Sequence, residues 1–365
     1  MNPKIGILGG GQLARMMALS GYPLGFEFVF FDPSANACAG QLGELMVADY
    51  HNEVALEEFC QKVDIVTIDF ENVPVDTLRF VQKKKPVFPS PDVLEIAQDR
   101  LTEKQFCRNH GIPTAEFEII NSCSELKFAA KKFNYDGILK TRRMGYDGKG
   151  QFRIDSAESI NSVPDELYSQ DLILEQRVPF VREVSVIVAR NGLGAIKTWP
   201  LCENKHKDGI LTTTIVPAKS SPLDEETTSH AVKLAEVLNY VGVLVIEFFQ
   251  TNEQVFVNEM APRVHNSGHW TIEGAHTSQF ENHLRAGLNL PLGSTAMSGM
   301  AAMLNWIGAF PDNVLSIIEP DLYWHLYGKE PRPGRKIGHS TLLAPTPQEL
   351  HDKIVNLVKK LGVQL

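Results

Sequence analysis

Glu247-Phe-Phe-Gln-Thr-Asn-Glu-Gln-Val-Phe-Val-Asn-Glu259 carries two carboxylates on neighbouring strand-like runs. The runs 243–249 and 255–260 are rich in β-branched and aromatic residues, and the short polar stretch between them is typical of a β-hairpin. Two carboxylates that face each other within an apolar sheet repel unless a cation lies between them. Proteins bind Mg²⁺ through one or two carboxylates together with phosphate oxygens. The segment therefore predicts a magnesium–nucleotide site with Glu247 and Glu259 as metal ligands.

The strand register decides whether these two carboxylates meet. They lie twelve residues apart, so a turn centred on Glu253 pairs them directly. A two- or four-residue loop centred between Asn252 and Glu253 instead pairs Glu247 with Asn258 and turns Glu259 to the opposite face. A shared cation therefore predicts an odd-length loop or a β-bulge. The alternative is one surface carboxylate and one that is bound by the backbone.

Composition narrows the class of protein. With 365 residues and 43% hydrophobic content, the chain is long enough for two or three domains with real cores. A net charge of −9 argues against a broad nucleic-acid surface. The five cysteines include no C-x-x-C pair, which indicates reduced thiols. The N-terminus does not resemble a signal peptide and no apolar run reaches about 20 residues, so we expect a cytoplasmic protein without nucleic-acid or membrane partners.

The first 98 residues alternate between strand and helix patterns, which predicts an α/β unit with a doubly wound parallel sheet. A helix is expected over 92–110, and Gly111 follows it as a stop signal. Strands are expected at 4–8, 27–31 and 64–69, and helices at 12–20 and 54–61.

The rest of the chain is expected to form a second domain over 99–290 and a C-terminal mixed α/β domain over 291–365. Within the second domain, residues 115–178 have the short strands of a small α+β lid. An exposed loop is one interpretation of 203–206. Strands are expected at 117–120, 137–141, 150–154, 172–175, 183–190, 195–202, 209–216 and 300–306, and helices at 124–133, 227–240, 279–286 and 347–361.

Residues 9–14, Gly-Gly-Gly-Gln-Leu-Ala, follow a strand and open a helix, and Asp32 ends the next strand. This spacing matches a dinucleotide-binding fingerprint and favours a nicotinamide-dependent oxidoreductase as the alternative function. Backbone amides at a helix N-terminus bind any phosphate, including that of a ribonucleotide, so the motif predicts phosphate binding more generally. A tight turn that binds no ligand remains the simplest alternative.

A second glycine-rich segment, 140–151, joins two of the lid strands. Its three glycines within six residues allow the backbone to approach phosphates closely, and Lys140 and Lys149 supply charge. An ordinary hairpin turn is the alternative, because Asp-Gly is a strong turn signal.

Polar residues elsewhere suggest further ligand contacts. Residues 175–178 end a strand and are candidates to bind an adenine and its ribose, or form a solvated strand end. His265 and His269 have the spacing of helical zinc ligands, but the Asn-Ser-Gly sequence between them disfavours a helix, so zinc is rejected. The four basic residues of 329–336, constrained by two prolines and a glycine, predict a phosphate clamp.

Together these motifs resemble the ATP-grasp superfamily over essentially the whole chain, and within it the 5-(carboxyamino)imidazole ribonucleotide synthase family. The segments that carry the resemblance are 9–13, 70–73, 99–100, 145–151, 258–271, 279–281 and 327–339. The resemblance implies an ATP-grasp fold in which 1–98 is the pre-ATP-grasp domain, 99–290 the ATP-grasp domain and 291–365 a domain that completes the substrate site. The implied reaction is ATP-dependent carboxylation of 5-aminoimidazole ribonucleotide by bicarbonate through carboxyphosphate.

The resemblance also implies roles for individual residues, with a homodimer as the assembly. ATP and one or two Mg²⁺ ions, for which Mn²⁺ can substitute, are the implied cofactors. The ATP-contacting positions are Arg100, Lys140, Gly145, Tyr146, Asp147, Gly148, Lys149, Gly150, Gln151, Glu175, Gln176, Arg177, Val178, Glu183, His206, Asn258 and Glu259.

Catalysis is assigned to Tyr146 and Asp147, which are expected to orient carboxyphosphate and the attacking amine, and to Arg263, which is expected to hold the bicarbonate-derived anion. A non-catalytic nucleotide-binding module and a transformylase that uses formyl phosphate are two further candidate functions. The ribonucleotide is expected to contact Gly11, Gln12, Leu13, Glu71, Asn72, His265, Asn266, Ser267, Lys329, Arg335 and Lys336.

Overall fold

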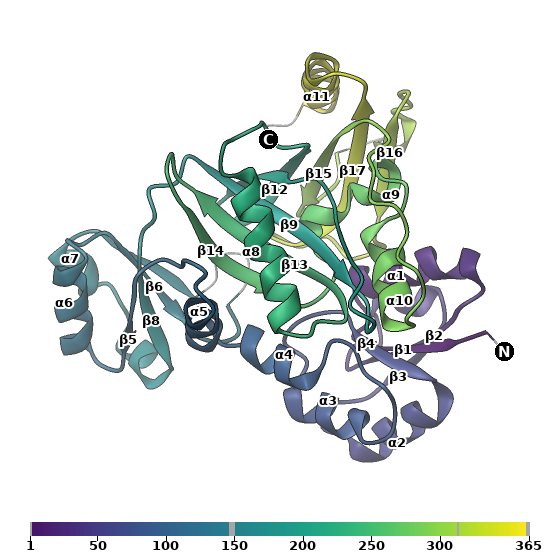
Figure 1. Ribbon diagram of the computed structural model, residues 1–365, viewed down its shortest axis with the longest axis horizontal. Coiled ribbons are helices and arrows are strands. Elements are labelled where there is room, and N and C mark those ends of the chain that lie inside the picture. The colour runs from purple at the N-terminus through teal and green to yellow at the C-terminus, as the bar shows by residue number, and fades with distance from the viewer. Residues whose placement is uncertain (1, 146–149, 312–313, 363–365) are drawn as a thin grey trace.

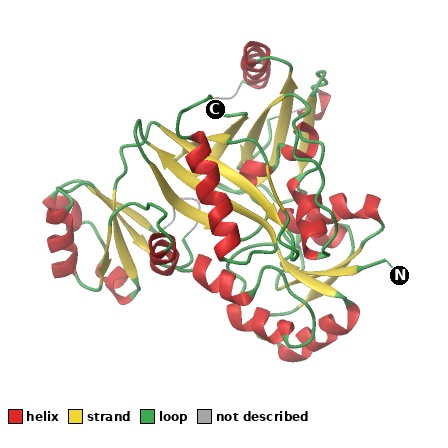
Figure 2. Cartoon of the chain, viewed as in Figure 1, coloured by secondary structure: helices red, strands yellow, loops and turns green. Residues whose placement is uncertain are grey.

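The computed structural model describes residues 2–145, 150–311 and 314–362, and these residues form three β-sheets with helices around them (Figure 1). An N-terminal parallel sheet lies beside a large antiparallel sheet, and a small antiparallel sheet projects on the far side of helix α5 (Figure 2). Among these described residues, no helix combines the length and the apolar character that crossing a membrane requires.

The N-terminal sheet is parallel throughout, with the strand order β3-β2-β1-β4, as the alternating pattern predicted. Alternate residues of its strands face opposite sides. Ile5 and Ile7 pack with helix α1, whereas Val29 and Phe31 pack with α2 and α3 on the other face. The elements are β1 (Lys4–Leu8), α1 (Gln12–Gly21), η1 (Tyr22–Leu24), β2 (Glu27–Asp32), η2 (Cys38–Gln41), β3 (Glu44–Val47), α2 (Glu53–Lys62), β4 (Ile65–Ile68), α3 (Val75–Gln82) and α4 (Pro91–Ala97).

The prediction of a single helix over 92–110 is wrong. The chain forms α4 and then α5 (Arg100–Asn109), with a break at Gln98 and Asp99. The Asp99 carboxylate accepts from the backbone N–H groups of Leu101 (3.0 Å) and Thr102 (3.4 Å), so it caps α5. An aspartate that binds two amides at a helix start favours a new helix there over continuation of the previous one.

The small sheet is antiparallel, with the order β5-β8-β6-β7, and it has its own apolar core under α6. Its four strands match the predicted lid. The elements are β5 (Phe117–Ile120), α6 (Cys123–Lys132), β6 (Gly137–Thr141), β7 (Gln151–Ile154), α7 (Ala157–Ile160), η3 (Asp165–Ser169) and β8 (Leu172–Gln176).

The large sheet has nine strands in the order β14-β13-β9-β11-β12-β15-β17-β16, with β10 paired to β9. Helix α8 lies across one face and α10 packs on the other, where it also contacts α1 (Figure 1). The elements are β9 (Arg182–Arg190), β10 (Ile196–Thr198), β11 (Cys202–Lys207), β12 (Ile210–Val216), α8 (Asp224–Val237), β13 (Gly242–Gln250), β14 (Val255–Ala261), η4 (Asn266–Gly268), α9 (Thr271–Gly274), α10 (Gln279–Gly287), β15 (Met300–Ile307), η5 (Val314–Ser316), β16 (Leu322–Leu326), β17 (Lys336–Ala344) and α11 (Pro347–Leu361).

One feature of this sheet differs from an interpretation of the sequence, and a second shows how the C-terminal segment joins the sheet. Residues 203–206 lie in strand β11 and are not an exposed loop. The strands of the C-terminal segment 291–365 continue the same sheet, because β15 pairs with β12 along Thr213 to Val216. This pairing extends the large sheet into the segment that carries the basic residues of 329–336.

Candidate active site

Glu247 and Glu259 lie directly opposite each other on β13 and β14. Gln250 pairs with Val255, which leaves a four-residue loop, and that loop alone would pair Glu247 with Asn258. The register shifts by one residue between Glu247 and Phe248, where Asn258 is the extra residue of a β-bulge. The bulge restores the pairing, which confirms the prediction of an odd-length loop or a bulge.

Burial and, to a smaller extent, the nearby Glu259 carboxylate together raise the pKa of the Glu247 carboxyl to about 7, although His206 opposes the shift. His265 Nε2 lies 3.6 Å from Glu247 Oε1, and Arg100 Nη1 donates to Glu259 Oε2 at 3.1 Å. A carboxyl group that resists ionisation until its charge is neutralised fits a cation site.

The described residues contain no group of three or more His, Cys, Asp or Glu side chains arranged to hold a metal ion. Glu247 and Glu259 therefore offer a two-carboxylate donor set, and a hard cation needs about six oxygen ligands. At magnesium–nucleotide sites, phosphate oxygens and water molecules usually supply the remaining ligands. The donor set fits Mg²⁺ bound together with a nucleotide.

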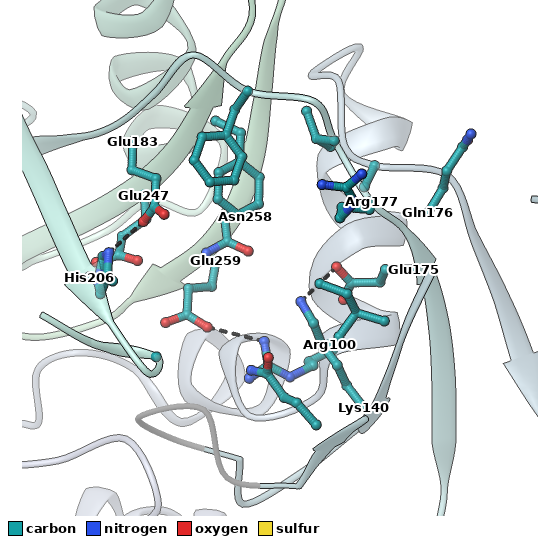
Figure 3. Close-up of a pocket in the computed structure, with 17 residues that line it drawn as sticks. Arg100, Lys140, Glu175, Gln176, Arg177, Glu183, His206, Glu247, Asn258 and Glu259 are labelled. Atoms are coloured by element: carbon teal, nitrogen blue, oxygen red, sulfur yellow. Dashed lines mark hydrogen bonds and ion pairs between the residues drawn. The ribbon is translucent and has the colours of Figure 1, made fainter. Parts of the chain in front are cut away.

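The two carboxylates border a cavity of about 360 Å³ between the lid and the large sheet (Figure 3). In that view Glu247 and Glu259 lie across the cavity from Glu175 and Lys140. Twelve residues predicted to contact ATP or metal line this cavity: Arg100, Lys140, Gln151, Glu175, Gln176, Arg177, Val178, Glu183, His206, Glu247, Asn258 and Glu259.

A buried ionic network forms the lid side of this cavity. Lys140 Nζ lies 2.9 Å and Lys104 Nζ 3.2 Å from Glu175 Oε2. Burial raises the pKa of the Glu175 carboxyl, but the charges of Lys104, Lys140 and Arg100 together outweigh it and lower the pKa to about 2. Burial lowers the pKa of Lys140, and the Glu175 charge partly restores it. The network keeps Glu175 ionised at the inner end of the cavity.

A second polar pair lies on the strand side. His206 Nδ1 is 2.5 Å from Glu183 Oε2, with β11 and β9 supplying the two residues. Burial lowers the pKa of His206, but its hydrogen bond to Glu183 and the nearby charge of Glu247 raise it, and the net pKa is above the ordinary value. A protonated His206 adds positive charge beside the carboxylates.

Sequence inspection missed the apolar wall of this cavity. The rings of Phe180 and Phe249 stack with centroids 4.6 Å apart at an angle of 8°. Phe249 lies two residues after Glu247, and this spacing on a strand places both side chains on one face. The two-residue spacing from Glu247 would therefore have identified Phe249 as a cavity residue. Ala115, Ile138 and Gly209 also line the cavity.

A larger cavity of about 820 Å³ adjoins the first, and Arg100 and Glu259 line both. It lies between the N-terminal sheet, the bulged strand and the basic segment. Besides Arg100 and Glu259, eleven further predicted site residues line it: Gln12, Leu13, Glu71, Asn72, Gly145, Arg263, His265, Asn266, Lys329, Arg335 and Lys336.

Two contacts order the walls of this larger cavity. The Arg263 Nε group donates a hydrogen bond to Glu71 Oε2, and this bond orients the Arg263 side chain. Arg263 is the residue expected to hold the anion, and Glu71 is expected to contact the ribonucleotide. Lys329 Nζ donates to Gln12 Oε1 at 2.6 Å, which ties the basic segment to the start of α1. Arg332 lines the cavity as well, so all four basic residues of 329–336 border it.

Three predicted contact residues do not line either cavity. Ser267 is fully buried, and its Oγ accepts a hydrogen bond from Ser185 Oγ at 2.8 Å, so it holds strand β9 to the segment after β14. Gly11 lies behind Gln12, and its amide is already bound to a carboxylate. Gly150, predicted to contact ATP, lies outside both linings and has a left-handed φ of +71° beside Thr141.

Carboxylates occupy much of the N-terminus of α1. Asp69 Oδ2 accepts from the N–H of Gly11 at 2.5 Å and Oδ1 from that of Ala14 at 2.8 Å, while Asp32 Oδ2 accepts from Gly10 at 2.7 Å. A phosphate at these amides would meet two acceptors of like charge. Asp32 therefore binds its own loop, which disfavours the nicotinamide-dependent alternative. Of the 9–13 loop, only Gln12 and Leu13 line the larger cavity.

Four predicted residues, Tyr146, Asp147, Gly148 and Lys149, lie outside the described residues. The segment that leads to them is held at its base. Arg142 donates to both carboxylate oxygens of Asp99, at 3.1 and 2.7 Å, and Arg143 Nη1 donates to Gln98 at 3.4 Å. Gln98 in turn donates to the backbone of Glu71 and Val73. Sequence patterns did not single out these contacts, although Gln98 and Arg142 line the larger cavity.

The three-sheet fold, with a lid sheet over a carboxylate-bearing hairpin, defines an ATP-grasp ligase. Family models match in the same arrangement: a ribonucleotide synthetase pre-ATP-grasp domain at residues 1–98, an ATP-grasp domain at 105–280 and a phosphoribosylaminoimidazole carboxylase C-terminal domain at 301–353. The chain belongs to the N5-carboxyaminoimidazole ribonucleotide synthase family.

Similarity to members of that family extends over nearly the whole chain. The N5-carboxyaminoimidazole ribonucleotide synthase of Pseudomonas aeruginosa is 45% identical over 354 residues, which cover 97% of this chain and 98% of that protein. The crystal structure of the Thermus thermophilus synthetase has 47% identity, a TM-score of 0.93 and 99% coverage of both chains. The Aspergillus clavatus enzyme, solved with ADP and 5-aminoimidazole ribonucleotide, has 31% identity, a TM-score of 0.91 and 99% coverage of both chains.

Proposed function

We propose that this protein couples ATP hydrolysis to carboxylation of the exocyclic amine of 5-aminoimidazole ribonucleotide, a step of purine biosynthesis. A bicarbonate oxygen attacks the γ-phosphorus of ATP, and the bond to ADP breaks, which gives carboxyphosphate. The bond between its carbon and the phosphoryl oxygen then breaks, which releases phosphate and carbon dioxide. The amine nitrogen attacks the carbon and loses a proton, which gives 5-(carboxyamino)imidazole ribonucleotide.

The junction of the two cavities carries this proposal. Arg100 and Glu259 border both, so a phosphoryl group transferred from a nucleotide in the smaller cavity would lie beside the larger one. Carboxyphosphate hydrolyses readily, and a shared boundary shortens its path to the amine. The basic residues Lys329 and Arg335 are suited to hold the ribonucleotide phosphate in the larger cavity.

The proposed metal ligands are Glu247 and Glu259, which would hold one or two Mg²⁺ ions, with Mn²⁺ as a substitute. When bound, the ion neutralises charge on the transferring phosphoryl group. Lys140 and Arg100 add fixed positive charge on the lid side, and Arg100 remains oriented by its contact with Glu259. This arrangement provides preorganised electrostatic stabilisation of the developing charge.

The remaining roles follow the resemblance to the family. Arg263 is proposed to hold the bicarbonate-derived anion, because its side chain lines the larger cavity and Glu71 fixes its orientation. Tyr146 and Asp147 are proposed to orient carboxyphosphate and the amine. Asn72, His265 and Asn266 are proposed to contact the ribonucleotide.

Release of phosphate from ATP tests the proposal. We expect release in the presence of bicarbonate and a strong stimulation when 5-aminoimidazole ribonucleotide is added, with one carbamate formed per phosphate when the product is trapped. Replacing bicarbonate with formate should abolish the stimulated rate, which distinguishes a formyl-phosphate-using transformylase. Stimulation by neither bicarbonate nor the ribonucleotide would contradict the assignment.

We further propose a cytoplasmic homodimer. The five cysteines are all free, as expected of thiols in a reducing compartment, and the assembly follows the resemblance to the family. Light scattering during size-exclusion chromatography should give about twice the 40.6 kDa chain mass. A mass near that of one chain at micromolar concentration would contradict the dimer.

A further inference from the structure

Helix α5 binds the outer edge of β14 on both sides of Glu259. Strand β14 is the first strand of the nine-stranded sheet, so β13 covers one of its edges. On the other edge, the Met260 N–H donates to Glu103 Oε1 at 2.5 Å, and the Asn258 carbonyl accepts from Lys104 Nζ at 3.2 Å. Two consecutive helix residues therefore bind the backbone immediately before and immediately after Glu259.

The edge position of β14 and the bulge together make these two hydrogen bonds necessary. An extra residue in one strand interrupts the ladder of backbone hydrogen bonds, and buried backbone groups without partners are costly. At the bulge the affected residue is Asn258, whose carbonyl is the group that Lys104 binds. Lys104 thus supplies the partner that the neighbouring strand would have supplied for this carbonyl, and Glu103 supplies one for the edge amide of Met260.

Both helix residues are unusual for their position. Glu103 is 2% exposed and Lys104 1% exposed, and charged side chains are rarely buried to this extent unless they are paired. Lys104 also contacts Glu175 Oε2 at 3.2 Å, so one ammonium group joins the bulged strand to the ionic network of the lid. A helix that only covered the edge of β14 could do so with apolar side chains. Glu103 and Lys104 instead bind two particular backbone atoms of the strand.

We infer that Glu103 and Lys104 are positioning residues that hold the bulge at Asn258 and thereby keep Glu259 opposite Glu247. This inference rests on the proposed metal role of those two carboxylates. Without the bulge, the four-residue loop pairs Glu247 with Asn258 and directs Glu259 to the opposite face of the sheet. The acceptor oxygen of Glu103, rather than its charge, is the feature that the Met260 amide requires.

The test compares Glu103→Gln, which keeps an acceptor oxygen, with Glu103→Leu, which removes it at similar size. Mn²⁺ binding is measured by electron paramagnetic resonance in the presence of a non-hydrolysable ATP analogue. We expect Glu103→Leu to weaken Mn²⁺ binding by about 10- to 100-fold, as is usual when the support of a metal ligand is lost, and Glu103→Gln to stay within about threefold of wild type. Gln105→Leu, on the exposed side of the same helix, is the matched control.

Hydrogen exchange provides a readout that does not depend on metal. The Met260 amide should exchange faster in Glu103→Leu and remain protected in Glu103→Gln. If Glu103→Leu fails to unfold cooperatively, Lys104→Met replaces it in the Mn²⁺ measurement, because that variant removes the bond to Asn258.

Two outcomes separate the inference from the proposed function. The positioning role alone would be overturned if Mn²⁺ binding is weaker in Glu247→Gln and Glu259→Gln but Glu103→Leu binds Mn²⁺ as tightly as Gln105→Leu does. Unchanged Mn²⁺ binding in Glu247→Gln and Glu259→Gln would overturn the metal role itself. Equal loss of Mn²⁺ binding in Glu103→Gln and Glu103→Leu would also contradict the inference, since the acceptor oxygen would then not matter.

Discussion

Arg100 donates from Nη1 to Glu259 Oε2 over 3.1 Å, at the boundary that the two cavities share. Asp99, the residue before Arg100, caps the same helix and binds Arg142 of the lid. Burial lowers the pKa of Arg100, but the charges of Glu259 and Glu175 outweigh it and raise the pKa, so this guanidinium stays charged. This fixed cation therefore borders both cavities.

Arg100→Lys should lower kcat/KM for ATP by about 10²-fold, because a point charge does not reproduce the planar donor geometry of the guanidinium at a transferring phosphoryl group. A coupled ADP assay measures the change. Arg153→Lys, on an exposed lid strand, should leave kcat/KM within about twofold of wild type. Equal activity of the Arg100 and Arg153 variants would show that Arg100 does not act on the transferring phosphoryl group.

Glu247→Gln and Glu259→Gln should each lower kcat by about 10³-fold or more, and the double variant should be little worse than either single one, because both carboxylates would act on one cation. Each variant should unfold cooperatively. The rise in melting temperature that wild type shows on adding magnesium-ATP should be reduced in both. Glu253→Gln in the hairpin loop is the control and should retain the full rise. Loss of cooperative unfolding in Glu259→Gln would indicate a structural role in place of metal binding.

Lys329→Ala and Arg335→Ala should raise KM for 5-aminoimidazole ribonucleotide by about 10- to 100-fold while KM for ATP changes little. The reason is that a charge-assisted hydrogen bond to phosphate contributes about 1.5–3 kcal/mol, and both residues line the larger cavity but not the smaller one. Initial rates with each substrate varied in turn measure the two constants. Lys353→Ala serves as the control, because Lys353 lies in α11 and pairs with Asp321. A parallel rise of both KM values would contradict separate sites.

Glu175 should make the fold sensitive to acid. Its pKa of about 2 lies below the ordinary value of 4.5, so its ionisation stabilises the folded state fully above pH 4.5, and this contribution is lost as the pH falls toward 2. Glu175→Gln should therefore cost about 3–5 kcal/mol at pH 7, since three buried cations lose their carboxylate, and should show a smaller additional loss between pH 4.5 and 2. Urea unfolding at a series of pH values measures both effects.

The control for this pH dependence is Glu118→Gln in the same lid sheet. Glu118 pairs with Lys132 on the surface, where an ion pair contributes at most about 1 kcal/mol. Its stability profile should follow that of wild type throughout. Parallel acid profiles for Glu175→Gln and wild type would show that the buried network does not control acid stability.

Much of this protein is determined by local sequence. The alternation of strands and helices predicted the parallel sheet because each element buries a face whose period appears in the chain. The lid strands and the two strands of the 247–259 hairpin follow the same rule. Local sequence suggested Lys140 and Glu175 as ligand contacts, the resemblance to the family added His206, and all three residues line one cavity.

Tertiary structure decided the features that local patterns do not encode. The bulge that brings Glu259 opposite Glu247 depends on Glu103 and Lys104, which lie more than 150 residues away in the chain. The glycine loop at 9–13 has the pattern of a dinucleotide site, yet Asp69, 58 residues beyond Gly11, binds its amides. Sequence periodicity predicts which face a residue occupies, whereas the partner of a backbone group at a bulge or a helix end is whichever distant side chain the packed fold brings within hydrogen-bonding distance.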